Sequence, residues 1–316
     1  MTAAQNQSSL KPKSRSYLNS IGIKAPFISI NTEATAPPRL QSRRTGPIWP
    51  LAPIQNRSRK KAMPVKALLN LVRRTPPRVE RVPDGMRVYA IGDIHGRLDL
   101  LDRLLAKIAA DDERRGDGVE TQYIFLGDLI DRGPDSRGVV ERLLAFSQSG
   151  AKVRFLMGNH EQVFLRALEG DHRALRFLAR IGGRETLQSY GISEEDYKAL
   201  DFDGLAEQAA EKVPAGHRAF LAGFETMIRL GDYLFVHAGI RPGVTLEEQE
   251  QNDLYWIRDE FLSHRDSFGA MVVHGHSITE DIDVRTNRIG IDTGAFATGR
   301  LTAIGLEGGE RWFLST

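Results

Sequence analysis

The chain has 316 residues, of which 41% are hydrophobic and 27% charged, so it can form a substantial core and is not globally disordered. It contains no cysteine, which excludes disulfides and thiolate-ligated metals, so any bound metal must use nitrogen and oxygen ligands. No apolar run reaches the roughly 18 residues of a membrane span and the N-terminus lacks a signal-peptide core, so we expect a soluble, cytoplasmic protein.

The formal net charge of +2 hides two segments of opposite sign. Residues 1–79 contain 15 Lys and Arg and one acid, Glu33, which leaves 28 basic and 40 acidic residues in 80–316, a net charge of −12. All eight histidines follow residue 90. The sequence therefore divides into a basic segment, 1–79, and an acidic domain, 80–316.

Residues 1–62 are rich in Ser, Pro, Asn and Arg and show no sustained hydrophobic period, which predicts disorder. Three interpretations stay open. The stretch could be a basic arm that contacts nucleic acid, an organelle transit peptide, or an artificial extension of a protein whose translation starts at Met63. We favour the start at Met63.

From residue 86 apolar strands alternate with amphipathic helices. Strands are predicted at 86–92, 121–127 and 152–158, and helices at 98–112, at 137–146 and from 161 onward. Residues 161–224 are mainly helical, and we find no chemistry in their sequence. The remainder is strand-rich, with the runs TMIRL, YLFVHAG, AMVVHGH, IDVRTNRIGIDTG, LTAIGL and RWFLST. This order predicts an α/β sandwich whose second half is closer to antiparallel.

Five of these predicted strands end in short runs where glycine accompanies residues that can bind metals. The runs are GDIHG (92–96), GDLIDRG (127–133), GNHE (158–161), HAG (237–239) and HGH (274–276). Because ligands bind beyond the carboxyl ends of strands in open α/β sheets, we expect these residues to form one polar cluster. Carboxylate, amide oxygen and imidazole suit Mn²⁺, Fe or Zn²⁺, and so many ligands suit two ions about 3.5–4 Å apart.

Together and in this order, the blocks resemble the signature of the phosphoprotein phosphatase family of calcineurin-like metallophosphoesterases, over residues 86 to about 305. The resemblance implies a two-sheet sandwich flanked by helices (αββα), with a dinuclear metal site at the strand ends. It implies two divalent ions, Mn²⁺ first and Fe or Zn²⁺ as alternatives. It also implies direct in-line attack by a hydroxide that bridges them.

The same resemblance assigns a role to each residue of the blocks. His160 would be the general acid, oriented by Asp131, and Arg132 and Arg258 would hold the substrate phosphate. The metal ligands that it implies are Asp93, His95, Asp128, Asn159, His237 and His276.

Taken singly, each ligand-type residue has an ordinary structural explanation, such as a turn or a helix cap, and only their joint occurrence points to a metal site. His274 is expected to be a structural neighbour of the site. His172, His217 and His264 are expected to be exposed. Glu161 is expected to open the next helix, where an acid suits the helix dipole.

Three functions remain open. Asp131 in GDLIDRG and Glu161 in GNHE favour a serine/threonine protein phosphatase acting on phosphoproteins. RGPDS and HAGI are more similar to symmetrical diadenosine tetraphosphatases, which is the alternative, with a small phosphoester as substrate. A non-catalytic metal- or phosphate-binding module is disfavoured because all the ligands are present. No membrane partner is expected, and nucleic acid only through the basic segment.

Overall fold

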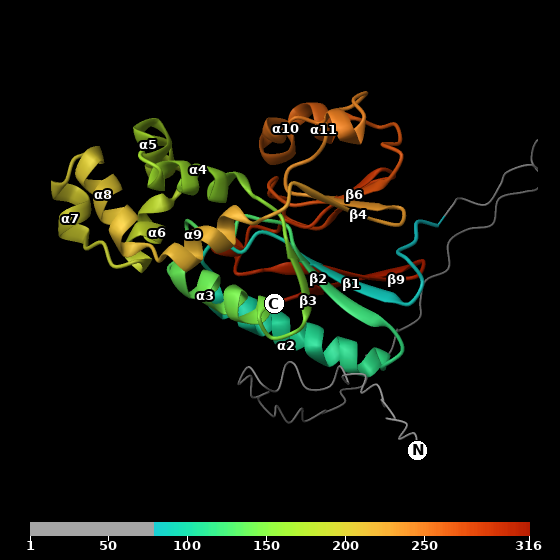
Figure 1. Cartoon of the computed structure of the whole chain (residues 1–316). Coiled ribbons are helices and arrows are strands. Elements are labelled where there is room, and N and C mark those ends of the chain that lie inside the picture. The colour runs from blue at the N-terminus through green and yellow to red at the C-terminus, as the bar shows by residue number, and fades with distance from the viewer. Residues whose placement is uncertain (1–78) are drawn as a thin grey trace, which may run out of the picture. The chain divides into compact units, whose positions relative to one another are not determined.

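The computed structural model describes residues 79–316, and every structural statement below concerns this part of the chain (Figure 1). The basic segment 1–79, with the start proposed at Met63, lies outside the described residues except for Val79. Within 79–316, no helix is both long and apolar enough to cross a membrane.

The strands are β1 (Met86–Ile91), β2 (Glu120–Phe125), β3 (Lys152–Phe155), β4 (Met227–Leu230), β5 (Tyr233–Val236), β6 (Met271–His274), β7 (Asp283–Val284), β8 (Arg288–Gly290), β9 (Thr302–Glu307) and β10 (Glu310–Ser315). The helices are α2 (Leu98–Arg115), α3 (Ser136–Ser147), α4 (Asn159–Leu168), α5 (His172–Ile181), α6 (Gly183–Ser189), α7 (Glu194–Ala199), α8 (Phe202–Lys212), α9 (Ala215–Ala222), α10 (Gln251–Trp256), α11 (Asp259–Ser263) and α12 (Ala295–Thr298), with a 3₁₀ turn at Leu246–Glu248.

The strands form two five-stranded mixed sheets. The first has the order β10-β9-β1-β2-β3, and the second has the order β4-β5-β6-β8-β7. In the first sheet β1, β2 and β3 are parallel, while β9 and β10 are antiparallel. In the second sheet β5, β6 and β8 are parallel, and only the outer strands β4 and β7 are antiparallel. Over the second half of the chain, β4–β5, β7–β8 and β9–β10 pair antiparallel, while β5–β6 and β6–β8 pair parallel, so this half is closer to antiparallel, as predicted. The parallel pair β5–β6 is joined by α10 and α11.

The two faces of β1 explain how the layers assemble. Val88 and Ala90 point toward the second sheet, whereas Tyr89 and Ile91 point toward the helices on the other side. Alternation with a period of two places successive side chains on opposite faces, so an all-apolar strand is buried on both. The outer face of the second sheet packs on α10 and α11. Figure 1 shows this order of layers, with α2 and α3 below and α10 and α11 above. The predicted αββα sandwich is confirmed.

The region predicted to be mainly helical contains the six helices α4–α9 (Asn159–Ala222), hereafter the helical segment. It lies at one end of the sheets (Figure 1). Its helices α6 and α9 pack against α3 of the sandwich. This contact fixes the helical segment beside the loop that joins β2 to α3, which carries Asp128, Asp131 and Arg132.

Candidate metal and phosphate site

The glycine-flanked blocks converge at one edge of the sandwich, in what we call the strand-end loops (92–97, 126–135, 156–160, 237–240 and 275–279). Backbone hydrogen bonds tie these loops together. The N–H groups of Ile94 and His95 donate to the carbonyl of Asp128 at 3.0 and 2.9 Å, and the N–H of Gly275 donates to that of His237 at 2.9 Å. The predicted cluster is therefore formed by loops from both sheets.

Left-handed backbone conformations are concentrated in these loops. Within residues 79–316, the non-glycine residues with positive φ are His95, Asp128, Asp131, Arg132 and His276, with φ between 49° and 72°. Such conformations cost about 1–3 kcal/mol each and persist where the surrounding structure holds them, often at functional sites. All five were candidates from the sequence, so the chain maintains strain where the chemistry is expected.

Glycine is required at two points where a loop passes a candidate carboxylate. A Cβ atom at Gly158 would collide with the carboxylate of Asp128, and one at Gly275 would collide with that of Asp93. Glycine beside each ligand block therefore lets neighbouring loops approach the acidic side chains closely.

Asp128 lies at the centre of the site. Its Oδ1 atom is 3.4 Å from Nε2 of His237, and its Oδ2 atom is 3.7 Å from Nε2 of His95. Two buried groups that could hold a metal ion share this carboxylate: His95, Asp128 and His160 form one, and Asp128, His237 and His276 form the other. One oxygen thus faces each group, which is the arrangement that a bridging ligand requires.

Backbone carbonyls orient two of the imidazoles. Nδ1 of His95 lies 2.9 Å from the carbonyl of Ile130, and Nδ1 of His237 lies 2.8 Å from that of Leu126. A carbonyl can only accept, so each Nδ1 carries the proton and each Nε2 keeps a lone pair directed into the site. Histidine ligands in metal proteins are commonly held in this way.

Several buried polar atoms of the site fit bound cations. Oδ1 of Asp93 and Nε2 of His276 are buried and have no hydrogen-bond partner, although Oδ2 of Asp93 accepts the N–H of His276 at 2.9 Å. Nε2 of His237 faces Oδ1 of Asn159 at 3.0 Å, so two lone pairs point at each other. Cations would satisfy all of these atoms. Asp93 and Asn159 lie in the cluster but outside the two groups described above.

Burial and charge set the protonation states that metal binding requires. Burial lowers the pKa of His95 to about 3 and that of His276 to about 2, so both imidazoles are neutral near pH 7. Burial alone would raise the pKa of Asp128, but the surrounding histidines, His237 first, lower it well below its ordinary value. Neutral imidazole and ionised carboxylate are the metal-binding forms.

His160 and Asp131, hereafter the acid pair, form a buried hydrogen bond of 2.7 Å between Nδ1 and Oδ2. Burial lowers the pKa of His160, but the carboxylates of Asp128 and Asp131 outweigh burial and raise it above its ordinary value. Nε2 of His160 faces the guanidinium of Arg132, which can only donate, so proton donation by His160 requires Arg132 to move away and this nitrogen to carry a proton. The hydrogen bond is the one that the predicted roles of these two residues require, and the roles themselves stay a prediction.

The two arginines predicted to hold phosphate differ in position. The guanidinium of Arg132 is half-buried between His95 and His160, at 2.8 and 3.0 Å from their Nε2 atoms, and it lies over the ring of Phe296. Arg258 is exposed, and its positive charge is among the smaller causes that lower the pKa of His237 and His276. Arg132 thus lies within the cluster, and phosphate binding by the two arginines stays a prediction.

Glu161 is structural, as the sequence suggests, but it does more than begin a helix. Its carboxylate accepts the N–H groups of Asp128 and Leu129 at 2.8 Å each, and that of Gly158 at 3.2 Å. Because Gly158 is the N-cap of α4, its bond to Glu161 satisfies one N–H group at the start of this helix. The fully buried Glu161 therefore joins two strand-end loops.

Of the histidines expected outside the site, His274 is a buried neighbour that contacts Arg288, and His172 is exposed. His264 is half-buried. The prediction of exposure was wrong for His217, which is 7% exposed and lies 3.0 Å from the hydroxyl of Tyr190. The run PAGHRAFLA around it is mainly small and apolar, which fits its burial, and the contact links α9 to the residue that ends α6.

The sequence interpretation missed three residues of the site. Asp292 is buried near Asp93, and burial raises its pKa to about 6. The run GIDTG has the strand-glycine-acid pattern of the other blocks and could have revealed it. Thr186 contacts Asp131 from the helical segment, and the ring of Phe296 packs against His95. Neither residue carries a local signal.

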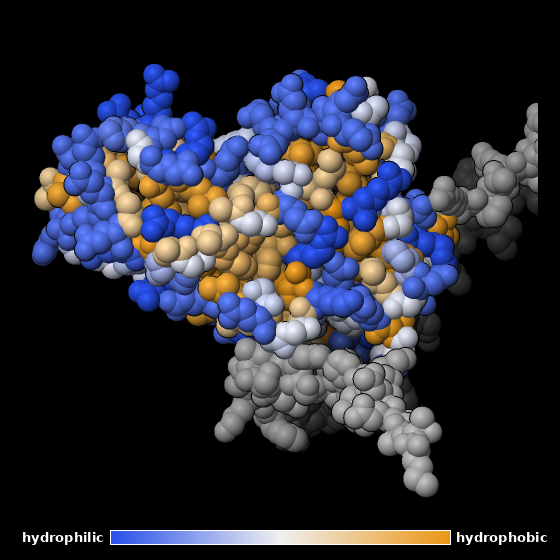
Figure 2. Space-filling model, in the orientation of Figure 1, coloured by the Kyte–Doolittle hydropathy of each residue, from blue (hydrophilic) through white to orange (hydrophobic). Residues whose placement is uncertain are grey.

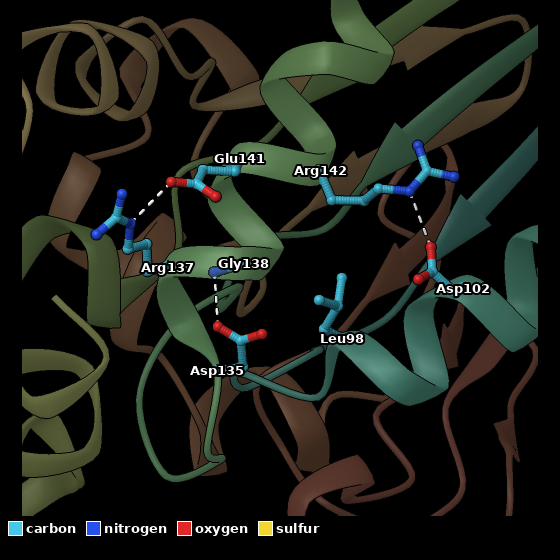
Figure 3. Close-up of a pocket in the computed structure, with 7 residues that line it drawn as sticks. All are labelled: Leu98, Asp102, Asp135, Arg137, Gly138, Glu141 and Arg142. Carbon is cyan, nitrogen blue, oxygen red and sulfur yellow. Dashed lines mark hydrogen bonds and ion pairs between the residues drawn. The ribbon is translucent and has the colours of Figure 1, made fainter. Parts of the chain in front are cut away.

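A groove leads outward from Arg132 along the first turns of α2 and α3. Its inner cavity has a volume of about 650 Å³ and is lined by Arg132 and Phe296. Its outer cavity, of about 460 Å³, shares Leu98, Asp102 and Asp135 with the inner one. Figure 3 shows the charged side chains of the outer cavity already paired, as in the ion pair of Arg142 with Asp102. Volumes of this size accommodate small ligands.

The surface over this end of the molecule is mixed in character. Figure 2 shows hydrophobic residues in the hollow between the helical segment and the region of α10 and α11, with polar residues around them. The exposed aromatic ring of Phe177, on α5, contacts Trp256 of α10. Trp256 in turn lies near His276, so apolar surface borders the metal groups on this side.

Comparisons with known proteins agree with the site. A family model described as calcineurin-like phosphoesterase matches residues 86–297. A symmetrical bis(5'-nucleosyl)-tetraphosphatase of Acidovorax sp. (strain JS42) is 36% identical over 163 residues, which are 52% of this chain and 47% of that protein. An asymmetrical bis(5'-nucleosyl)-tetraphosphatase of Oceanobacillus iheyensis is 22% identical over 69% of this chain and 88% of its own length.

Among solved structures, that of a proposed diadenosine tetraphosphatase covers 76% of this chain and 96% of its own, with a TM-score of 0.52 and 22% identity. This likeness establishes the fold alone. The chain spans about half the length of the symmetrical enzymes that it matches. These findings confirm the metallophosphoesterase resemblance. They support the tetraphosphatase alternative better than the protein phosphatase that Asp131 favoured.

Proposed function

Because the chain belongs to the calcineurin-like phosphoesterase family, we propose that it is a metal-dependent hydrolase that cleaves dinucleoside polyphosphates. The observation that carries the proposal is the pair of buried ligand groups that share Asp128. The substrate class is supported by the 36% identity to a symmetrical bis(5'-nucleosyl)-tetraphosphatase.

In this proposal six residues hold two divalent ions, with Asp128 between them. Bound there, the ions would supply a hydroxide nucleophile near neutral pH and neutralise charge on the phosphoryl group. Mn²⁺ remains the metal that we expect, with Fe or Zn²⁺ as alternatives. The ligands proposed for the two ions are Asp93, His95, Asp128, Asn159, His237 and His276.

Other residues of the chain would bind the substrate and deliver the proton. Arg132 turns from the two histidines to a phosphate, which its planar guanidinium can grip with two hydrogen bonds, and Arg258 contributes a second positive charge. His160 donates a proton to the departing oxygen while Asp131 holds its ring. The groove beyond Arg132 offers space for the remainder of a substrate much larger than one phosphate.

A serine/threonine protein phosphatase remains the second candidate because of the acid pair. An alkoxide that leaves from phosphoserine is strongly basic and needs a proton, whereas a leaving phosphate group, with a pKa of about 6, needs it less. The buried hydrogen bond between His160 and Asp131 favours an enzyme that handles basic leaving groups. A non-catalytic binding module would have no use for such a pair.

The decisive experiment measures turnover by the purified full chain with Mn²⁺ on three substrates in parallel. These are diadenosine tetraphosphate, a phosphothreonine peptide and p-nitrophenyl phosphate. We expect the dinucleotide to be preferred, and the appearance of ADP alone would establish symmetrical cleavage, whereas AMP with ATP would establish asymmetrical cleavage. Preference for the peptide would support the second candidate. Two bound metals without turnover of any substrate would leave the binding module.

A further inference from the structure

Asp131 is held from the side opposite His160 by two buried hydroxyl groups. Its Oδ1 atom accepts the hydroxyl of Thr186 at 2.5 Å, while Oδ2 faces His160. Its N–H lies 2.9 Å from Oγ1 of Thr186 and 3.0 Å from Oγ of Ser136, and the two hydroxyls are 2.9 Å apart. Thr186 and Ser136 are both fully buried. Three contacts thus lock Asp131 to these hydroxyls.

The available protons fix the direction of each bond. An ionised carboxylate only accepts and a hydroxyl has one proton, so the proton of Thr186 must go to Oδ1 of Asp131. Thr186 then accepts from the backbone N–H of Asp131 and from the hydroxyl of Ser136. With Oδ1 engaged, Oδ2 is the oxygen left for the imidazole of His160. Thr186 therefore sets the rotation of the carboxylate that orients His160.

The same short stretch of the helical segment supports the backbone beside Asp131. The N–H of Arg132 donates to the carbonyl of Gly182 at 2.9 Å, and its Nε donates to the carbonyl of Ile181 at 3.3 Å. Asp131 and Arg132 both have left-handed conformations, with φ of 72° and 68°, which need such support. Residues 181–186 thus hold both the orienting acid and the phosphate-gripping arginine.

We propose that Thr186 is a positioning residue for proton transfer from His160 to the leaving group. Thr186 touches neither the substrate nor the metal groups and acts only through Asp131. This inference rests on the proposed function in one respect, that the site hydrolyses phosphate esters or anhydrides. It holds for either substrate class.

The test compares Thr186→Val with Thr186→Ser in the full chain. Valine keeps the shape of threonine but lacks the hydroxyl, so the carboxylate loses its anchor, whereas serine retains it. We expect Thr186→Val to lower kcat about 10-fold on a phosphothreonine peptide and less than about 2-fold on p-nitrophenyl phosphate, whose leaving group needs no proton. Thr186→Ser should stay within about 2-fold of the parent on both substrates.

A spectroscopic measurement gives a second readout that does not require turnover. The Nδ1 proton of His160 lies in a short buried hydrogen bond and should give a downfield proton NMR signal, identified by its loss in His160→Ala. In Thr186→Val this signal should shift or broaden. Ser189→Ala is the matched control because its hydroxyl lies on the same helix α6 and contacts the carbonyl of Thr186, not Asp131.

Equal loss of activity on both substrates would overturn the proposal, because a merely structural role affects both alike. If Thr186→Val left both the ratio of the two kcat values, on the peptide and on p-nitrophenyl phosphate, and the NMR signal unchanged, the proposal would be overturned as well. Should Thr186→Val fail to fold, Thr186→Ala carries the same expectations. If the parent chain hydrolyses no phosphate compound, the proposed function fails, while the NMR comparison still decides whether Thr186 positions His160.

Discussion

The strand-end loops and the helical segment contribute to one site in different ways. The loops supply the groups that would bind metal, and each group comes from a short glycine-flanked run, as do Asp93 and His95 in GDIHG. The helical segment beyond its first turn supplies a hydroxyl and two backbone carbonyls, all directed at Asp131 and Arg132. The difference predicts that metal binding and proton delivery have separate supports and can be disrupted separately.

The largest effect is expected from replacing Asp128, the carboxylate that the two ligand groups share. Asp128→Asn removes the charge that faces both ligand groups, so neither ion is held tightly. Turnover should fall about 10³-fold or more, and the bound metal measured by mass spectrometry should fall from two ions to one or none. Added Mn²⁺ should also stop raising the melting temperature, because metals stabilise only the form that binds them. Two ions retained in the variant would refute the bridging role.

His160→Ala should separate proton delivery from metal binding. The variant should keep both ions and lose about 10²–10⁴-fold in turnover on alkyl phosphates, the usual contribution of a general acid. The loss on p-nitrophenyl phosphate should be much smaller, because its leaving group departs without a proton. Metal content and the two rates are measured on the same preparation. Equal activity of variant and parent on the phosphothreonine peptide would exclude His160 as the acid.

The residues of the strand-end loops could be predicted from the sequence more readily than those of the helical segment. Asp128, Asn159 and the histidines of the cluster could be predicted because the period of the strands and the glycines beside them are local features of the sequence. The fold could be predicted for the same reason. The parallel direction of β5, β6 and β8 could not be predicted, because it depends on how the connections between these strands return across the sheet.

Thr186 and His217 could not be predicted because their roles arise only in three dimensions. Thr186 is 55 residues from Asp131, and a threonine within a helical pattern carries no sign of its partner. His217 lies in a mainly small and apolar run, but its contact is with Tyr190, 27 residues earlier, which no local pattern indicates. Asp292 is different, because its glycine-flanked run GIDTG is a local feature of the sequence that could have indicated it.

A smaller effect is expected at Leu98 in the groove, because this residue belongs to neither the strand-end loops nor the helical segment. Leu98→Trp fills the part that the two cavities share without touching the metal groups or the acid pair. The KM for diadenosine tetraphosphate should rise about 10-fold, or about 1.4 kcal/mol, while hydrolysis of p-nitrophenyl phosphate stays unchanged. Arg103→Trp, exposed on the same helix α2, is the matched control. An unchanged KM would show that the dinucleotide does not lie in this groove.

The smallest effect concerns the stability of the helical segment alone. Burial lowers the pKa of His217, so the folded state binds fewer protons than the unfolded state below the ordinary histidine pKa of about 6.5. The stabilising contribution of the neutral ring is therefore present above about pH 6.5 and is lost as the pH falls toward the folded pKa.

The free energy of unfolding, measured with urea in the presence of a chelator, should accordingly fall between pH 7 and pH 5. His217→Gln should reduce that slope by at most about 1.4 kcal/mol per pH unit, the limit for one proton. His172→Gln, an exposed histidine of α5, is the matched control. Because His217 contacts Tyr190 at the end of α6, amide exchange in α6 and α9 should quicken first on acidification. Faster exchange beginning instead in the strand-end loops would mean that their buried histidines, not His217, initiate acid unfolding.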